Sequence, residues 1–456
     1  MIIKDRELLN EDGSVPIELL VKCIQNHRSN VERLDLLNNY YDGEHRIKQR
    51  QFNNSELPNN KIVCNHAQYI SDMAVGYVFG VPISYSGNSA ERLINIFTKI
   101  DEDSHNNELA SDISIFGVGY ELIYMNNEKV PYPELAVLSP RNTFVVADST
   151  VKHKVMFAVN YYEKRDVNDT LLGYYVNVYT DHEIYHYLFS DLNSVSPQEL
   201  DLDEHFFGDV PIIEYWNNKK QHGDFEGVLS LIDAYNLLQS DRLNDKEQLV
   251  DAILAVINAS FGDDEEELTE TEKFLKEHKI LELPRDADAK WLTKQLNENE
   301  IEVLKKSLKD DIHEFSKVPC LTDENFVGNA SGVAMKYKLL GFEQLGKTKE
   351  RYFKQGLRQR LKLMSNVENI RAKNIDSSQI DITMKRSLPV DEELQARIAQ
   401  ETDGFISWET RVKRFDEEID VEAEKKRLDE ENKQKMEQQQ KAFGSYDFKK
   451  VDDIDE

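Results

Sequence analysis

Apolar residues recur at helical spacing in the first part of the chain. Residues 17–41 place apolar side chains three or four positions apart among charges, and the pattern stops at the turn-like Asp42–Gly43. The apolar stretch 62–80 predicts a buried helix, which Val81–Pro82 should end before a strand begins. A further helix is expected across 90–115. The chain therefore begins with an α-helical region.

Between Gly117 and about Tyr215 the pattern changes to short β-rich runs. YELIYM, FVVAD, KVMFAVNYY and LLGYYVNVYT are rich in β-branched and aromatic residues and are separated by turn residues. These runs predict antiparallel strands, so the fold class expected is α+β.

Two long helices are predicted in the second half. Residues 224–258 carry a loose apolar stripe that the polar run QSDRLNDKEQ interrupts, which predicts polar contacts with other helices. A second helix follows, with Ile301, Leu304, Leu308, Ile312 and Phe315 at helical spacing. The runs KILELP and AKWLTK between them are typical of a small module with a hairpin.

The remaining pattern predicts a loop, a helix, a strand and a helical end. Residues 318–332 are loop-like, and a helix over 333–365 should be weakened or bent by its three glycines. A strand is expected over 378–388. The helical region from Asp391 onward has little apolar stripe at its end, so a frayed end is expected.

Composition excludes several classes of protein. The 456 residues suggest about three domains. The 85 acidic side chains against 56 basic ones give a net charge of −29, which is the wrong sign for a general DNA-coating protein. Three distant cysteines indicate free thiols rather than a disulfide framework. Neither a secretion signal nor a membrane span is expected from the charged N-terminus and the mean hydropathy of −0.61.

Five segments in order resemble one protein family. They are YYDGEHRIKQR at 40–50, LPNNKIVCNHAQYISDMAVGYVFGVPISY at 57–85, VPIIEYWNN at 210–218, LIDAYNLLQSDRLND at 231–245 and VPCLTDENFVGNASGVAMKYKL at 318–339. Together they resemble portal proteins of tailed bacteriophages, of the type found in long-tailed phages of Gram-positive bacteria. The resemblance runs across nearly the whole chain.

The resemblance implies a ring, usually of twelve subunits, at one capsid vertex of the virion. Double-stranded DNA passes through its channel during packaging and ejection, without sequence readout. The implied partners are the large terminase subunit, head-completion or adaptor proteins, and the major capsid and scaffolding proteins, with assembly in the host cytoplasm. From the residues themselves, no enzyme activity, no cofactor, no metal and no membrane are expected.

The resemblance also implies a portal fold with an α/β wing, a long-helix stem, a small α/β clip and a helical crown. The segments carried over are wing 1–223 and 318–390, stem helices 224–257 and 296–317, clip 258–295, crown 391–440 and a flexible tail 441–456. Within the second wing segment they are the tunnel loop 318–332, the long helix 333–365 and the strand 378–388.

The predicted tunnel loop carries the candidate DNA-proximal residues. They are Thr322, Asp323, Asn325, Phe326, Asn329 and Ser331, followed by Lys336 and Lys338. The polar residues either make sequence-independent DNA contacts or cap the following helix, and both roles are compatible. The helix 333–364 has nine Lys or Arg against two Glu. Either Lys336 and Lys338 contact phosphate, or most of these cations pair with acidic neighbours between subunits.

The stem and clip region is strongly acidic. Residues 224–316 contain 24 acidic and 11 basic side chains, a net charge of −13. Repeated around a ring, this charge repels the DNA backbone, which favours sliding over binding. Five consecutive acids, Asp263, Asp264, Glu265, Glu266 and Glu267, are predicted on the partner-binding surface of the clip. They lack the spaced ligands of a calcium loop, so a solvated loop is favoured over a cation site.

Other candidate sites are weak. The run around Gly117 and Gly119 lacks the third glycine of a dinucleotide site, and no phosphate-binding P-loop occurs. His182 and His186 share a strand face without further zinc ligands, and Cys64 beside His66 is more typical of packing than of a nucleophile. Two alternatives to a portal stay open: an acidic helical scaffold or adaptor without a DNA channel, and a metal-dependent nuclease or protease.

Overall fold

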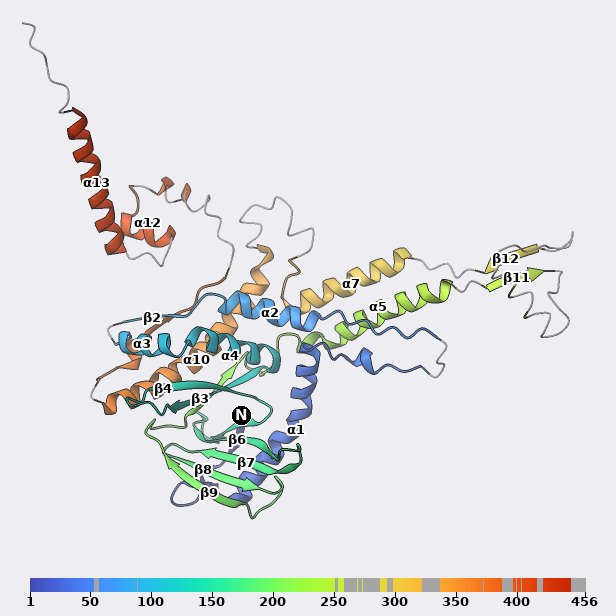
Figure 1. Ribbon diagram of the computed structural model, residues 1–456, viewed down its shortest axis with the longest axis horizontal. Coiled ribbons are helices and arrows are strands. Elements are labelled where there is room, and N and C mark those ends of the chain that lie inside the picture. The colour runs from blue at the N-terminus through green and yellow to red at the C-terminus, as the bar shows by residue number, and fades with distance from the viewer. Residues whose placement is uncertain are drawn as a thin grey trace, which may run out of the picture. The chain divides into compact units, whose positions relative to one another are not determined.

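The computed structural model describes residues 1–52, 57–87, 89–250, 253–257, 269, 273, 288–292, 298–321, 337–371, 373–387, 397–398, 400–402, 404–415 and 421–443. These belong to two compact units, Met1–Ser387 and Leu388–Glu456. Helices and strands are both abundant in the first unit (Figure 1), so the predicted α+β class is confirmed.

Four helices form the N-terminal helical region. They are α1 (Ile17–Tyr41), α2 (His66–Phe79), α3 (Glu91–Lys99) and α4 (Glu102–Phe116). The bounds of α1 and α2 agree with the sequence pattern. The single helix expected across 90–115 is wrong, because Asp101 adopts the left-handed conformation with φ 50° and separates α3 from α4.

A six-stranded sheet lies against α1. Its order is β1 (Ile2–Lys4), β5 (Thr143–Asp148), β6 (Val155–Arg165), β7 (Leu171–Tyr179), β8 (Glu183–Phe189) and β9 (Gln198–Glu204). The pairs are antiparallel as predicted, except that β1 pairs parallel to β5. Apolar side chains of α1 pack on one face of this sheet, and apolar side chains of a second, three-stranded sheet pack on the other face.

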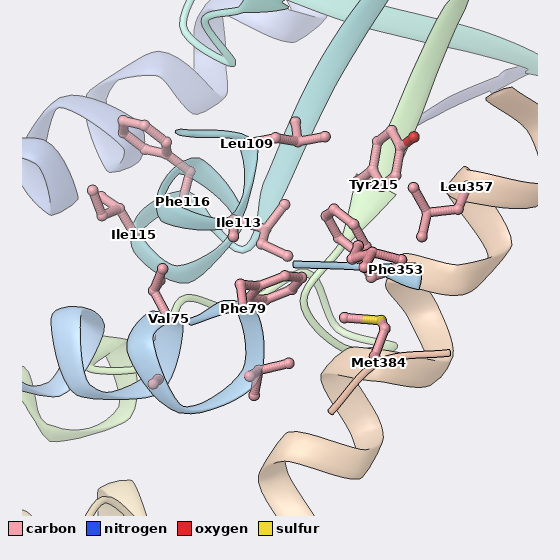
Figure 2. Packing of buried hydrophobic residues seen from close by; sticks show 14 of the residues in the cluster. Val75, Phe79, Leu109, Ile113, Ile115, Phe116, Tyr215, Phe353, Leu357 and Met384 are labelled. Carbon is pink, nitrogen blue, oxygen red and sulfur yellow. The ribbon is translucent and has the colours of Figure 1, made fainter. Parts of the chain in front are cut away.

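A three-stranded sheet connects the six-stranded sheet to the remaining helices. Its order is β10 (Ile212–Trp216), β3 (Val118–Met125) and β4 (Pro133–Leu138). Its other face packs against α4 and against the long helix α10 (Leu340–Ile370). Figure 2 shows the centre of this core, where Phe79 of α2, Ile113 of α4 and Phe353 of α10 converge near Tyr215.

Two helices, α5 (Leu229–Val250) and α7 (Glu298–Ser316), lie side by side in the region predicted as stem (Figure 1). The second matches its prediction. The first is shorter than the 224–257 expected, because the β-branched run Ile253–Ile257 forms strand β11 instead of a last helical turn. β11 pairs with β12 (Asp288–Leu292). A hairpin module is thus present, but its second strand contains the AKWL of AKWLTK, and KILELP lies outside the described residues.

The end of the chain departs from its predicted bounds. Helix α10 is described from Leu340 and continues to Ile370, five residues past the expected end. The strand predicted over 378–388 is only β13 (Asp381–Thr383), which pairs with β2 (Ser84–Ser86). The second unit contains α12 (Trp408–Phe415) and α13 (Val421–Phe443).

Candidate functional site

The residues predicted to approach DNA fall mostly outside the described structure. Outside the described residues lie Thr322, Asp323, Asn325, Phe326, Asn329, Ser331 and Lys336. The acids predicted on the clip surface also lie outside them: Asp263, Asp264, Glu265, Glu266 and Glu267. Lys338 is described and exposed. The structure describes α7 and Lys317 before the predicted tunnel loop, the first four residues of that loop, 318–321, and helix α10 after it.

Polar residues of α5 bind the backbone of a segment outside any helix or strand, residues 60–64, here called the ladder segment. The amides of Asn60, Ile62 and Cys64 donate to Asn244 Oδ1, Ser240 Oγ and Asn236 Oδ1 at 2.8, 2.9 and 2.8 Å. The bonded amides are two residues apart in the ladder segment, and the accepting side chains are four residues apart in α5. Two residues of extended chain rise about 6.6 Å and four helical residues about 6.0 Å, so the spacing of the donors matches that of the acceptors.

This contact explains the polar interruption in the apolar stripe. The prediction of polar contacts with other helices is confirmed for Arg242 and Lys246, which pair with Glu302 and Glu298 of α7. It is wrong for Ser240 and Asn244, which, like the neighbouring Asn236, accept backbone N–H groups. Two of the five segments that carry the family resemblance, 57–85 and 231–245, are therefore in direct contact.

Helices α5 and α7 form a predominantly acidic pair. Together they carry ten acidic and five basic side chains. Arg242 lies 2.5 Å from Glu302, and Lys246 lies 3.4 Å from Glu298, so two of the five cations pair with acids across the two helices. The excess of acid is therefore a property of the helices themselves, independent of the predicted clip.

An aromatic cluster joins α2, α5 and α7 where the chain leaves α7. The ring of His66 meets those of Tyr235 and His313 edge-on, with centroids 4.9 and 5.5 Å apart, and Tyr69 meets His313 at 5.6 Å. Burial, assisted by nearby His313 and Lys309, lowers the pKa of His66 to about 4. This histidine is therefore neutral at pH 7.

Arg360 is a fully buried cation on α10. Its guanidinium lies 2.6 Å from Glu102, 2.5 Å from Glu121 and 2.9 Å from Asn106 Oδ1. Burial alone would raise the pKa of Glu121, but Arg360 and His105 outweigh it and lower the pKa to about 2. The hydroxyl of Tyr215 also donates to Glu121, at 2.9 Å. The network fixes α10 to α4 and β3.

Lys349 forms a second buried contact on the same helix. Its Nζ lies 2.5 Å from Asp224 and 2.6 Å from Asn217 Oδ1, and the side chain is 1% exposed. Asp224 is the first residue of the region predicted as stem, so this pair ties α10 to the chain just before α5.

The basic residues of α10 are paired largely within the chain. Besides Lys349 and Arg360, three further ion pairs are Lys347 with Glu343, Lys354 with Glu350 and Lys362 with Asp209. The expectation of pairs between subunits is therefore wrong for Lys349 and Arg360, which are buried against acids of their own chain. A sequence signal existed: Lys349 and Arg360 fall on the apolar stripe that contains Phe342, Phe353 and Met364, and a cation there must be buried and paired.

The weak metal candidates have ordinary partners. His186 in β8 contacts Asn177 Oδ1 at 2.8 Å and Asp203 at 3.2 Å, while His182 precedes the strand. Over the described ranges, no three His, Cys, Asp or Glu side chains come together as a metal site. Nor does any helix in those ranges have the length and apolar content to cross a membrane.

A comparison with family models decides between the alternatives left by the sequence. The model described as phage portal protein, SPP1 Gp6-like, matches residues 20–438, which include α5, α7, α10 and every strand of both sheets except β1. The chain belongs to this portal family. Membership supports the portal interpretation over the scaffold or adaptor alternative, and it places the chain at the portal vertex of the capsid in the virion.

Two curated portal proteins are similar over most of their length. The portal protein of Bacillus phage SPP1 is 23% identical over 395 residues, which cover 81% of this chain and 75% of that protein. The portal protein of Clostridium phage phiCD119 is 24% identical over 311 residues, covering 64% and 68%.

Solved structures with a partial likeness come from gene transfer agent particles. The neck of a native GTA particle, computed with C12 symmetry, matches with a TM-score of 0.45 and 14% identity over 77% of this chain and 89% of that one. The virion of a native GTA particle matches with a TM-score of 0.42 and 15% identity over 76% and 88%. The portal assignment rests on the family match.

Proposed function

We propose that this portal-family chain assembles head-to-tail with copies of itself into a closed ring of twelve subunits, through which double-stranded DNA enters and leaves the capsid. A heterologous interface that closes on itself makes a ring. The observation that carries the proposal is the family match over residues 20–438. It fits a chain whose role is structural, and we propose that it catalyses no reaction.

The charge of α5 and α7 supports passage of DNA in preference to binding. Their acids outnumber their bases two to one, and a ring repeats that excess in every subunit. A negative wall repels the phosphate backbone at short range, so few sites exist at which DNA would be retained.

The segments take the roles that the family implies. We assign the wing to 1–223 and 318–390, the stem to α5 and α7, the clip to 258–295 and the crown to 391–440. The tunnel loop 318–332, with Lys336 and Lys338 after it, approaches the DNA, and the acids 263–267 belong to the partner surface of the clip. The partners proposed are the large terminase subunit, head-completion or adaptor proteins, and capsid and scaffolding proteins.

Native mass spectrometry with negative-stain imaging tests the ring. Protein purified alone and protein recovered from co-expression with the cognate capsid and scaffolding proteins are compared. We expect a species of twelve or thirteen times 53.0 kDa with a central hole in at least one preparation. A compact dimer as the largest species in both would contradict the proposal, and metal-dependent hydrolysis lost on replacing one acid would contradict the absence of catalysis.

A further inference from the structure

Residues 317–321 leave α7 and turn back onto the helical body. Lys317 adopts φ 63°, which reverses the chain, and Val318 is fully buried in the main core. The ring of His313 contacts the Val318 carbonyl oxygen through Nδ1 at 2.8 Å. The chain is thus fixed for its first two residues after α7, but Cys320 and Leu321 lie further from the core and are partly exposed.

The hydroxyl of Tyr69 forms hydrogen bonds with the backbone of residues 319–321. Tyr69 Oη donates to the carbonyl oxygen of Pro319 at 3.1 Å and accepts from the amide of Leu321 at 3.1 Å. A phenol has one proton to give and lone pairs to accept, so this single group meets both backbone atoms. Leu321 is the fourth residue of the predicted tunnel loop 318–332 and the last residue of that loop that the structure describes.

The tyrosine itself is held in place. Tyr69 lies in the first turn of α2, whose neighbours Ala67 and Ile70 are fully buried. Its ring packs edge-on against His313 of α7. The start of α2 is in turn joined to α5 by the ladder segment, through Cys64 and Asn236. These contacts fix the position of the Tyr69 hydroxyl relative to α5 and α7.

We propose that Tyr69 is a positioning residue that fixes the first residues of the tunnel loop, 319–321, to the wing. The proposal rests on the proposed function for the identity of that loop. With the Leu321 amide bound to α2, the base of the loop cannot shift along α7, and load applied to the loop is transmitted to the wing core. The residue neither contacts DNA nor contributes to the ring in this account.

The direct test is Tyr69→Phe, which removes only the oxygen. Tyr41→Phe is the matched control, because its hydroxyl also contacts α2, through Asp72 at 2.8 Å, but not residues 317–321. Hydrogen exchange of the Leu321 amide, measured by fragment-resolved mass spectrometry on assembled protein, should be at least ~10-fold faster in Tyr69→Phe and unchanged in Tyr41→Phe. Equal exchange in wild type and Tyr69→Phe would overturn the proposal.

The functional arm uses proheads assembled with each variant and measures DNase-protected DNA at equal ring content. We expect Tyr69→Phe to package at least about threefold less DNA than wild type and Tyr41→Phe to match wild type. Faster exchange at Leu321 with unchanged packaging would show a merely structural contact and reject the positioning role. Failure of wild-type proheads to package any DNA would instead reject the proposed function, while the exchange result would still stand.

Discussion

Arg360 illustrates how a charge is accommodated in a core by full pairing. Its guanidinium contacts two carboxylates and an amide, and the carboxylates accept further hydrogen bonds from Tyr215, from Tyr85 and from His105 when that nitrogen is protonated. A buried ion pair adds little net stability over an apolar pair, but removing one partner leaves an uncompensated charge. The identity of residue 360 is therefore tightly constrained.

Arg360→Met should lower the free energy of unfolding by about 3–5 kcal/mol, because Glu121 and Glu102 lose their cation in a dry site. Arg358→Met, on the exposed face of the same helix, should change it by less than about 0.5 kcal/mol. Urea unfolding measures both. Adding Glu121→Gln to Arg360→Met should restore part of the loss; no recovery would indicate that packing, and not charge, is what Arg360 supplies.

Four histidines with lowered pKa values, His27, His45, His66 and His205, make stability fall with acidification. Burial lowers the pKa of His27 to about 4, against the raising effect of the Pro140 carbonyl, and burial lowers that of His66 to about 4 as well. Since the unfolded chain binds the protons of His27 and His66 near pH 6.5 and the folded chain only near pH 4, stability is full above pH 6.5 and decreases below it.

From pH 7.5 to 5.5, which stays above the pI of 4.9, His27 and His66 should each cost about 1 kcal/mol of unfolding free energy. His66→Phe should remove its share of this dependence. His182→Gln, at an exposed position, should keep the full dependence, and equal slopes for His66→Phe and wild type would contradict the assignment.

At the scale of elements, α10 depends on glycine for close approach and not for bending. A Cβ at Gly356 would lie 2.2 Å from the ring of Tyr215, so the absence of a side chain lets α10 lie against β10. Gly346 similarly faces Tyr77. At Gly341 the nearest atom is 4.0 Å away, at Lys317. The expectation that the three glycines weaken or bend the helix overlooked the packing role of two of them.

The glycines offer a matched pair of substitutions. Gly356→Ala should destabilise the protein by about 2 kcal/mol or more, because the Tyr215 ring must move and its hydroxyl then leaves Glu121. Gly341→Ala should leave stability unchanged or raise it by up to about 1 kcal/mol through helix propensity. Thermal unfolding compares the two, and equal effects would mean that the contact with Tyr215 is not tight.

At the scale of the whole molecule, the two signs of charge have different locations. The excess of acid is concentrated in the predicted stem and clip, whereas two basic residues of α10, Lys349 and Arg360, are buried in ion pairs that fasten the wing from inside. We expect ring assembly and DNA passage to depend on separate parts of the chain. A change confined to the predicted tunnel loop should affect only the second.

Deletion of residues 323–330 should leave ring assembly largely intact and reduce DNA packaging severely, because the body that holds α5, α7 and α10 together lies outside the deletion. Imaging of rings and nuclease protection of packaged DNA measure the two effects. Deletion of the C-terminal residues 449–456 is the length-matched control. Loss of rings in the 323–330 variant alone would show that the segment is structural.

The sequence predicts elements better than the contacts between them. The bounds of α7 and the end of α1 could be predicted, because the apolar periodicity of α7 and the turn residues Asp42–Gly43 are signals within the local sequence. The sequence of 253–257 also fits a helical stripe, through Ile253 and Ile257. These residues form a strand because they pair with 288–292, a contact that the local sequence does not show. The contacts of Tyr69 with residues 250 positions away have no local signal.

The ladder between α5 and residues 60–64 has a consequence for how this protein tolerates sequence variation. The helix supplies side-chain oxygens, so positions 236, 240 and 244 require small acceptors, while positions 60, 62 and 64 contribute main-chain N–H groups to these bonds. Any amino acid except proline provides that group. At Ile62 only the main-chain N–H enters the ladder, so this position should accept many side chains, and a saturation library at Ile62 should reject proline most strongly.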